Sequence, residues 1–487
     1  MSINSLTALL LRGASVAFGV VALTFSMPAF SAATIVIQNI NAAGAGFNDA
    51  TPAAPIGGNT GTTLGAQRLN AFQAAASIWG ATLSSTQTIV VRASFEPLGC
   101  TATTAVLGDA FAFNIWRDFP NAPRTFTLYP QALANKYAGF NLGANVPNGL
   151  GQDIRARFNA RLGLPDCLAG SPFYLGLDNN HGPMIDLVTV MLHELAHGLG
   201  FENFTNGDDG AQFDGPSIWD HFLFDTTTNK LWVNMTDAER AASARNPRKV
   251  VWTGANVTNA VPFVLSQGTP RLAISGPAAG PAAGEYMIGT AEFGTPVGTA
   301  PVTGQLMPVV DQADGSGLAC TPLNSINALA VKNNIALVVR GTCTFEAKAK
   351  NLQDAGAIAM IAVDNVPGSP PDDIGNDPAV PGVVIPAVRI TQADGAVLKD
   401  RLTRRSRTAS GVIADLRVNL NQRAGADPQG RALLYTPNPF DQGSSVAHWD
   451  TIASPNQLME PSTADDLTHQ IAPPRDLTLP LFEDIGW

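Results

Sequence analysis

Two histidines four residues apart, with a glutamate directly after the first, are the side chains of this sequence best suited to chemistry. Residues 193–200 read His-Glu-Leu-Ala-His-Gly-Leu-Gly. On a helix, residues four apart lie on one face, so His193 and His197 can bind one metal ion while Glu194 points toward its bound water. The pattern is a zinc-hydrolase signature. It predicts one catalytic Zn²⁺ ion, with Glu194 as the general acid-base that moves the proton of that water.

The residues around this motif predict the helix that would carry it. Apolar side chains recur at three- and four-residue steps and form a stripe offset from the histidines; they are Ile185, Val188, Leu192, Leu195 and Leu199. Gly200 is suited to end the helix, because glycine adopts the left-handed conformation found just past helix ends. One face of the helix is therefore expected to pack and another to bind the metal.

The balance of charge excludes some partners. The 487 residues include 29 Lys and Arg against 39 Asp and Glu, a net charge of −10. Nucleic acids and anionic membranes bind clustered positive charge, so neither is expected as a partner. A short basic cluster lacks aromatic neighbours and is interpreted as a solvated helix end; it consists of Arg401, Arg404, Arg405 and Arg407. The length predicts two or three domains.

Residues 1–32 have the pattern of a secretory signal peptide. Arg12 precedes an apolar run, Gly13–Met27, that is too short to span a bilayer, and Ala29 and Ser31 fit the small-residue cleavage pattern. We therefore expect a protein that is secreted, to the extracellular or periplasmic space, and free of the membrane after signal cleavage. An uncleaved membrane anchor is the alternative interpretation.

The cysteines of an exported protein are expected to form disulfides, because oxidising compartments preserve these bonds. The four cysteines allow three pairings. Cys100 and Cys167 precede the zinc motif, whereas Cys320 and Cys343 share a later segment, so the pairs Cys100–Cys167 and Cys320–Cys343 are expected. A cysteine-rich zinc cluster is the weaker alternative, since no C-x-x-C spacing is present.

Hydrophobic periodicity outlines the organisation of the chain. A strand at 34–40, a helix around 69–83 and a half-buried strand at 89–95 are the expected start of an α+β domain. The Gly-, Ala- and Pro-rich stretch Gly276–Gly284 is predicted to be a linker. Beyond it, strands and helices alternate and imply a small inserted α/β domain; we expect strands at 335–339, 357–363, 385–390 and 412–418, and helices at 345–355 and 392–402.

The zinc motif and three later segments together resemble the leishmanolysin-type branch of the metzincin metallopeptidases. The later segments are 447–450 (Ala-His-Trp-Asp), 458–461 (Leu-Met-Glu-Pro) and 477–487, which ends in Gly-Trp. In that branch the third zinc-binding histidine follows a long insertion, and a Met-turn lies beneath the metal. The resemblance implies that His448 is the third ligand and Met459 the Met-turn methionine.

Other candidates for the third ligand fit less well. A short-spaced metzincin would place it at Asn203, whose neutral amide is a weak zinc ligand compared with imidazole. The remaining histidines are His181, His221 and His469. None of them combines a downstream Met-turn with flanking residues like those of the family.

The inserted segment resembles a protease-associated (PA) domain in residues 337–345, 354–357 and 385–388. The resemblances imply an α+β fold, in which a metzincin-like zinc peptidase domain carries an inserted α/β PA domain. The expected divisions are a signal peptide, 1–32; the N-terminal part of the peptidase domain with the zinc helix, 33–270; the PA domain with its linkers, 271–425; and the C-terminal part with the third ligand and the Met-turn, 426–487.

These features favour a secreted zinc-dependent endopeptidase that hydrolyses protein or peptide substrates through a zinc-activated water. Two alternatives are a zinc hydrolase of a non-peptide substrate and a non-catalytic PA-domain binding protein with a structural zinc site. The presence of Glu194 argues against the second. The PA segment contains no histidine. It is expected to fold as its own unit and to restrict or recruit substrates, so that excising roughly 286–421 preserves hydrolysis of small peptides.

Several acidic residues are assigned weaker roles. Asp186, Asp220 and Asp450 are candidate partners of the zinc-binding histidines, although a surface or helix-capping role is favoured for each. Calcium binding is unsupported, because the acidic loop after the motif does not have EF-hand spacing; its residues are Asp208, Asp209 and Asp214.

The sequence also departs from the family pattern. Some metzincins carry a tyrosine two residues after the Met-turn methionine, where it stabilises the tetrahedral intermediate. That position is Pro461 here, so the oxyanion stabiliser is unassigned. The resemblances do not extend to the stretch 222–270.

Overall fold

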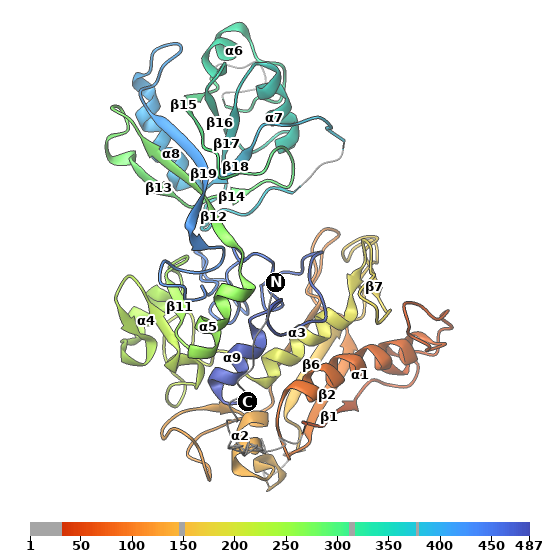
Figure 1. The fold of residues 1–487 in the computed structure, drawn as a ribbon. Coiled ribbons are helices and arrows are strands. Elements are labelled where there is room, and N and C mark those ends of the chain that lie inside the picture. Colours follow the sequence, from red (N-terminus) through yellow and green to blue (C-terminus); the bar gives the residue numbers. More distant parts are fainter. Residues whose placement is uncertain (1–31, 146–150, 311–316, 376–378) are drawn as a thin grey trace, which may run out of the picture.

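The chain folds into two lobes joined by a pair of long strands (Figure 1). Of the residues that the structure describes, those within 267–423 form the upper lobe, and those before and after them form the lower lobe. The computed structural model describes residues 32–145, 151–310, 317–375 and 379–487. The predicted signal peptide, apart from its last residue, lies outside the described residues. No helix in the described ranges is both long and apolar enough to cross a membrane.

A mixed four-stranded sheet forms the N-terminal part of the lower lobe. It consists of β1 (Ile35–Asn39), β2 (Ile89–Glu96), β3 (Gly108–Ala112) and β6 (Ile154–Asn159). The order is β1-β2-β6-β3, with β1, β2 and β6 parallel and β3 antiparallel at the edge. With helix α1 (Leu64–Thr82) between its first two strands, the sheet confirms the predicted strand-helix-strand start.

The motif helix, α3 (Leu187–Leu199), contacts this sheet and α1. Asp186 caps it, accepting a hydrogen bond from the Thr189 amide at 2.7 Å. Because the cap is Asp186, Ile185 lies before the helix in β8 (Ile185–Asp186) and not on its apolar stripe as predicted. The helix ends at Gly200, as predicted, with a positive φ of 127° that favours glycine.

Close packing fixes the position of α3. At Gly198 a Cβ atom would lie only 2.2 Å from Cγ2 of Ile154 on β6, so glycine is needed for the helix to lie this close to the sheet. The indole of Trp79 on α1 donates a hydrogen bond to the Leu192 carbonyl at 3.1 Å. The indole of Trp487 donates to the Leu199 carbonyl at 2.9 Å, which satisfies an acceptor at the helix end.

The stretch 222–270 and the C-terminal residues complete the lower lobe. Buried side chains from 33–265 and 426–485 share one hydrophobic core. The elements of the stretch are β9 (Leu223–Asp225), β10 (Lys230–Leu231), α4 (Asp237–Ser243), β11 (Val250–Trp252) and α5 (Ala255–Val264), and the C-terminal helix is α9 (Thr478–Ile485). The shorter elements are β4 (Ile115–Trp116), β5 (Tyr129–Pro130), α2 (Gln131–Ala138) and β7 (Phe173–Tyr174), with 3₁₀ turns at 46–48, 142–145, 219–221 and 232–234.

The upper lobe is built on an eight-stranded sheet of order β13-β12-β19-β15-β16-β17-β18-β14. Its strands are β12 (Gln267–Ser275), β13 (Gly284–Tyr286), β14 (Gly289–Thr290), β15 (Val302–Pro308), β16 (Ile335–Val339), β17 (Ala359–Val363), β18 (Ala387–Ile390) and β19 (Ile413–Arg423). The helices are α6 (Ser325–Val331), α7 (Phe345–Asp354) and α8 (Gln392–Arg401), with 3₁₀ turns at 280–282 and 402–404. Strands β15 to β18 run parallel, which confirms the predicted strand-helix alternation.

The predicted linker at Gly276–Gly284 is wrong. Ala279 and Ala282 are 0% and 1% exposed in the core of the upper lobe. The stretch follows β12, and small residues let its turns pack closely there. The connection between the lobes instead lies where β12 begins and β19 ends. At that point the Ala424 amide donates a hydrogen bond to the Ser266 carbonyl at 3.1 Å.

A second contact joins the lobes away from the strand pair. Ser369 of the upper lobe and Asn438 of the lower lobe form an isolated antiparallel bridge. The Ser369 amide donates to the Asn438 carbonyl at 2.8 Å, and the Asn438 amide donates to the Ser369 carbonyl at 2.6 Å. The upper lobe therefore contacts the segment that leads to His448.

Both predicted disulfides are confirmed. Cys100 bonds to Cys167 in the lower lobe, and Cys320 bonds to Cys343 in the upper lobe. The first joins the loop before the edge strand β3 to the loop after β6, so it restrains the approach to that edge.

Candidate metal centre

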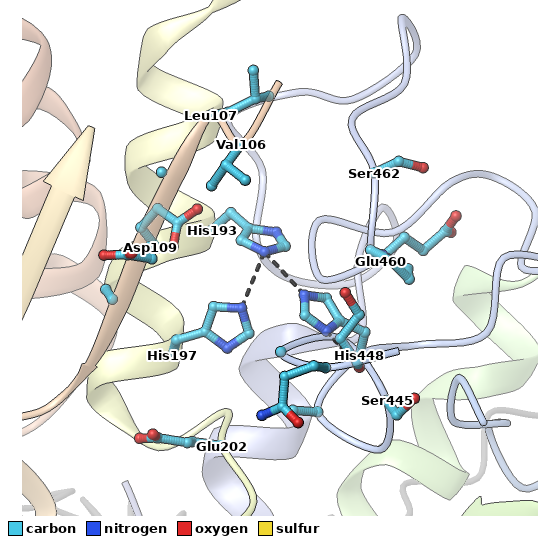
Figure 2. Close-up of a pocket in the computed structure, with 18 of the residues that line it drawn as sticks. Val106, Leu107, Asp109, His193, His197, Glu202, Ser445, His448, Glu460 and Ser462 are labelled. Atoms are coloured by element: carbon cyan, nitrogen blue, oxygen red, sulfur yellow. Dashed lines mark hydrogen bonds between the residues drawn. The ribbon is translucent and has the colours of Figure 1, made fainter. Parts of the chain in front are cut away.

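All four predicted site residues lie around one cavity of about 1060 Å³ in the lower lobe. Most of its walls come from three parts of the chain: residues 104–111, which include most of β3; the helix α3 with the loop that follows it; and the segment 440–463 (Figure 2). Leu168, Ile185, Trp232 and Leu467 complete the lining. The edge strand and the helix α3 therefore face a segment that lies more than two hundred residues later in the sequence.

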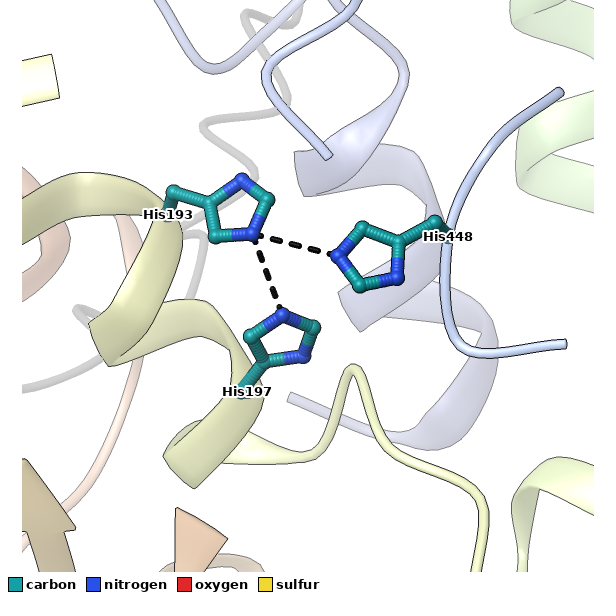
Figure 3. Close-up of side chains that lie close together, drawn as sticks. All are labelled: His193, His197 and His448. Carbon is teal, nitrogen blue, oxygen red and sulfur yellow. Dashed lines mark hydrogen bonds between the residues drawn. The ribbon is translucent and has the colours of Figure 1, made fainter. Parts of the chain in front are cut away.

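Three imidazoles converge in this cavity (Figure 3). Nε2 of His193 lies 3.1 Å from Nε2 of His197 and 3.2 Å from Nε2 of His448. The ligand atoms of the three residues all lie within 4.8 Å of one another. Tetrahedral zinc with Zn–N bonds of about 2.0–2.1 Å separates its ligand atoms by about 3.3 Å, close to both of these Nε2–Nε2 separations.

Backbone carbonyls orient the three rings. Each Nδ1 atom donates a hydrogen bond to a main-chain oxygen; the pairs are His193 with Leu458 at 2.8 Å, His197 with Phe201 at 2.7 Å and His448 with Ser444 at 2.9 Å. Such partners fix the tautomer of a metal-binding histidine. Since Nδ1 carries the hydrogen in each ring, the three Nε2 lone pairs face one another.

This donor set fits a bound cation. Burial lowers the pKa of His193 to about 4 and that of His197 to about 3, and it lowers the pKa of His448 well below its usual value. The rings are therefore neutral at pH 7, and no Nε2 has a hydrogen to donate to its neighbours. A metal ion satisfies the three converging lone pairs, and neutral imidazole is a ligand that zinc prefers.

The predicted carboxylate partners of the histidines do not contact them. Asp186 caps α3 and lies 3.0 Å from Nε2 of His469. Asp220 accepts hydrogen bonds from Thr205 and from the Ser217 amide. Asp450 lies 3.6 Å from Nε of Arg248. The favoured capping role is thus confirmed for Asp186.

Glu194 lies beside the triad and is 6% exposed. Its Cγ and Oε1 atoms approach the edge strand at Gly108, where a Cβ atom would lie 2.9 and 3.0 Å from them. Burial raises the pKa of Glu194 to about 8, and the nearby charge of Asp109 adds to the shift. A buried carboxyl with a pKa near neutral is suited to accept and return a proton.

Gly108 was not predicted from the sequence, although a glycine inside a strand is a signal of close backbone approach. Replacing it with Ala would push a methyl group against the Glu194 side chain and against the Arg157 carbonyl, which lies 3.0 Å from the added Cβ. We expect Gly108→Ala to lower kcat by about tenfold or more through displacement of Glu194. The bound zinc content should stay unchanged. Normal kcat in this variant would contradict the positioning role of Gly108.

The other candidate ligands do not join the three converging histidines. Nδ1 of His181 contacts the Met184 carbonyl at 2.7 Å, and Nε2 of His221 contacts Oγ1 of Thr127 at 3.1 Å. Asn203 lines the cavity, but its side-chain oxygen accepts a hydrogen bond from the Thr205 amide at 2.7 Å.

The methionine of the predicted Met-turn is buried, and it directly follows the residue whose carbonyl contacts His193. Met459 is 0% exposed, and its carbonyl accepts a hydrogen bond from the Trp449 amide at 2.8 Å. The preceding residue, Leu458, supplies the carbonyl that orients His193. Pro461 lines the cavity, and no tyrosine is among the described residues that line it.

The acidic loop after α3 does not gather its carboxylates. Asp208 pairs with Arg245 at 3.0 Å, Asp214 pairs with Arg117 at 2.8 Å, and Asp209 accepts from the Ala211 amide. Within the described ranges, the three histidines are the only group of His, Cys, Asp or Glu residues placed to share an ion.

Comparison with known proteins identifies the upper lobe. Residues 302–398 match the family model of the PA domain. The chain therefore contains a PA domain, as the sequence resemblance predicted, within a mixed α+β fold.

Curated relatives match short stretches of the chain. One from Oryza sativa subsp. japonica, the receptor homology region, transmembrane domain- and RING domain-containing protein 1, is 41% identical over 81 residues, or 17% of this chain and 15% of that protein. The ER degradation-enhancing alpha-mannosidase-like protein 3 from Homo sapiens is 34% identical over 82 residues, or 16% of this chain and 9% of that protein. The chain thus spans a small part of each relative.

Solved structures resemble about a third of the chain. A zinc aminopeptidase from Bacillus subtilis is 21% identical and covers 34% of this chain and 35% of its own, with a TM-score of 0.23. An aminopeptidase from Aneurinibacillus sp. strain AM-1 is 17% identical and covers 36% of this chain and 33% of its own, with a TM-score of 0.22.

Proposed function

We propose that this protein is a secreted zinc-dependent endopeptidase of the leishmanolysin-like metzincin type. The observation that carries the proposal is the convergence of three Nε2 atoms, from His193, His197 and His448, beside the buried carboxyl of Glu194. The family-like segments around His448 and Met459 support the metzincin assignment. The disulfides are consistent with export to an oxidising compartment.

In this proposal His193, His197 and His448 hold one Zn²⁺ ion. Such an ion supplies Lewis-acid chemistry, because it activates water at neutral pH and polarises a carbonyl group. Glu194 takes a proton from the attacking water and returns it to the leaving amine. The carbonyls of Leu458, Phe201 and Ser444 keep the three rings in the tautomer that leaves Nε2 free for the metal.

The edge strand favours an extended peptide as substrate. β3 pairs with β6 on one side only, and its residues 108–111 line the cavity on the other. On this free edge the Ala110 amide is bonded to Glu194 and the Ala112 amide to Glu202, so an extended chain would pair with the other amide and carbonyl groups that the edge presents. Backbone pairing along the strand needs no chain terminus, which favours cleavage at internal peptide bonds.

Hydrolysis of a protein substrate tests this function against its alternatives. We expect purified protein to cleave casein or gelatin internally, to lose this activity with a chelator and to regain it with zinc. The same assay with unblocked dipeptides measures aminopeptidase activity, which should be weak. Chelator-sensitive hydrolysis of esters alone would favour a non-peptide substrate. Zinc binding without any hydrolysis would favour a PA-domain binding protein.

We further propose that residues 33–270 and 426–487 form the catalytic unit and that 271–425 is an inserted PA unit which restricts or recruits large substrates. Separate hydrophobic cores in the two lobes support this division. The excision should run from 267 to 423 instead of from 286 to 421, because β12 starts at Gln267 and β19 ends at Arg423. A cut at 286–421 would leave β12 without its partner strand.

Replacing 267–423 by a short glycine bridge should therefore preserve hydrolysis of small blocked peptides and change the rate on large proteins. The hydrogen bond between Ala424 and Ser266 shows that the new ends lie close together. Unchanged rates on every protein substrate would contradict the role proposed for the PA unit.

A further inference from the structure

Apart from the histidines, the titratable side chains that line the cavity are all acidic. Its walls contain five carboxylic side chains and no lysine or arginine among the described residues; the five are Asp109, Glu194, Glu202, Asp208 and Glu460. Peptide substrates differ in charge mainly through their side chains. The distribution of these carboxyls therefore bears on which peptides bind.

Three of the five are already engaged. Asp109 accepts a hydrogen bond from Nε of Arg157 at 2.8 Å, and Asp208 pairs with Arg245 at 3.0 Å. Neither arginine lines the cavity. Glu194 has the proposed proton-transfer role. Glu202 and Glu460 are left without a basic partner among the described residues.

These two differ in what their carboxyls do. Glu460 is 5% exposed, and its Oε1 accepts a hydrogen bond from the Gln457 amide at 2.7 Å within the same turn. It therefore holds the Met-turn segment together. Glu202 is half-buried, and one oxygen, Oε2, accepts from the Ala112 amide at 3.2 Å. No described hydrogen bond or ion pair engages its Oε1.

Glu202 lies where a peptide paired with β3 would pass. Ala112 is the last residue of β3, so the Glu202 carboxyl lies at the end of the edge strand (Figure 2). A peptide paired with β3 would carry its side chains past this point. Burial raises the pKa of Glu202 to about 8. A cationic group beside the carboxyl would lower that pKa, because opposite charge favours the ionised form.

We propose that Glu202 is a specificity-determining residue that binds the side chain of an arginine or lysine in the substrate. The inference rests on the proposed peptidase function and names its substrate class as peptides with a basic residue near the scissile bond. An α-amino group is a second source of positive charge. The experiment separates it from a side chain.

The test uses fluorogenic peptides, acetylated and amidated at their ends, in pairs that differ only by arginine or the uncharged isostere citrulline. The substituted position is moved along both sides of the scissile bond. At one position, wild-type kcat/KM should be about tenfold higher for arginine. In Glu202→Gln, which keeps the acceptor for the Ala112 amide, the ratio should fall below about twofold. The readout is the ratio of the two rates, which separates a loss of charge recognition from a general loss of activity.

Asp214→Asn is the matched control. It removes one negative charge from the same loop, but Asp214 lies outside the cavity lining and pairs with Arg117. This variant should keep the arginine preference. Binding gives a readout independent of turnover: zinc-loaded Glu194→Gln protein should bind the arginine peptide about tenfold more tightly than the citrulline peptide. Addition of Glu202→Gln should remove that difference.

Several outcomes would overturn the inference. They are equal rates for arginine and citrulline at every position, an arginine preference that survives in Glu202→Gln, and a preference that appears only with a free amino terminus. In each case chelator-sensitive hydrolysis of the citrulline peptide would leave the proposed peptidase function standing. Absence of that hydrolysis would reject both.

Discussion

Glu194→Ala is expected to abolish peptide hydrolysis while zinc stays bound. Glu194 moves a proton and is not one of the three converging ligands, so its loss removes a contribution of about 10²–10⁴ to the rate. The three imidazoles keep their carbonyl partners in this variant. We expect residual kcat/KM below about one per cent of wild type on a small blocked peptide, with an equal molar content of zinc.

Glu194→Gln is the matched variant, because it keeps the shape of the side chain against Gly108 and removes only the capacity to accept the proton. It should be nearly as inactive as the alanine variant. Activity above a few per cent in either variant, or loss of the metal in both, would show that Glu194 does not have the assigned role.

His448→Ala is expected to weaken zinc binding and to eliminate turnover. The residue supplies one of three converging Nε2 atoms from a segment 255 residues after His193. Loss of an outer partner of a ligand already costs about 10–100-fold in affinity, so loss of the ligand itself should exceed about 100-fold. Competition with a chromogenic zinc chelator measures the affinity directly.

His221→Ala and His469→Ala are the matched controls. His221 contacts Thr127 and His469 contacts Asp186, and neither belongs to the converging group. Both variants should keep zinc and most of the activity. If His221→Ala loses as much zinc as His448→Ala, the assignment of His448 as the third ligand is contradicted. The leishmanolysin-like proposal would then be contradicted as well.

Local patterns were enough to predict the parts of the site that come from side-chain type and spacing. His193 and His197, four residues apart, lie on the helix α3 as their spacing predicted. The positions of the cysteines predicted both disulfides. His448 required the resemblance to a family, because no local pattern relates it to a helix 255 residues earlier.

The features that were missed depend on the backbone or on distant packing. Carboxylates were considered as partners of the histidines, but main-chain carbonyls have that role, and every residue carries such a group. Gly276–Gly284 has the composition of a linker, yet the small size of Ala279 and Ala282 also lets them be buried. Gly108 contacts Glu194, and Glu202 contacts Ala112, only because β3 packs against α3 and the loop that follows it. No local pattern in the sequence predicts that packing.

The position of the metal tests the proposed centre most directly. Crystals of the zinc-equilibrated protein, measured on both sides of the zinc absorption edge, should show one anomalous peak in the cavity beside Glu194. We expect this peak about 2.0–2.1 Å from Nε2 of His193, His197 and His448. A peak on other residues, or a peak on His193 and His197 with His448 turned away, would contradict the three-histidine centre.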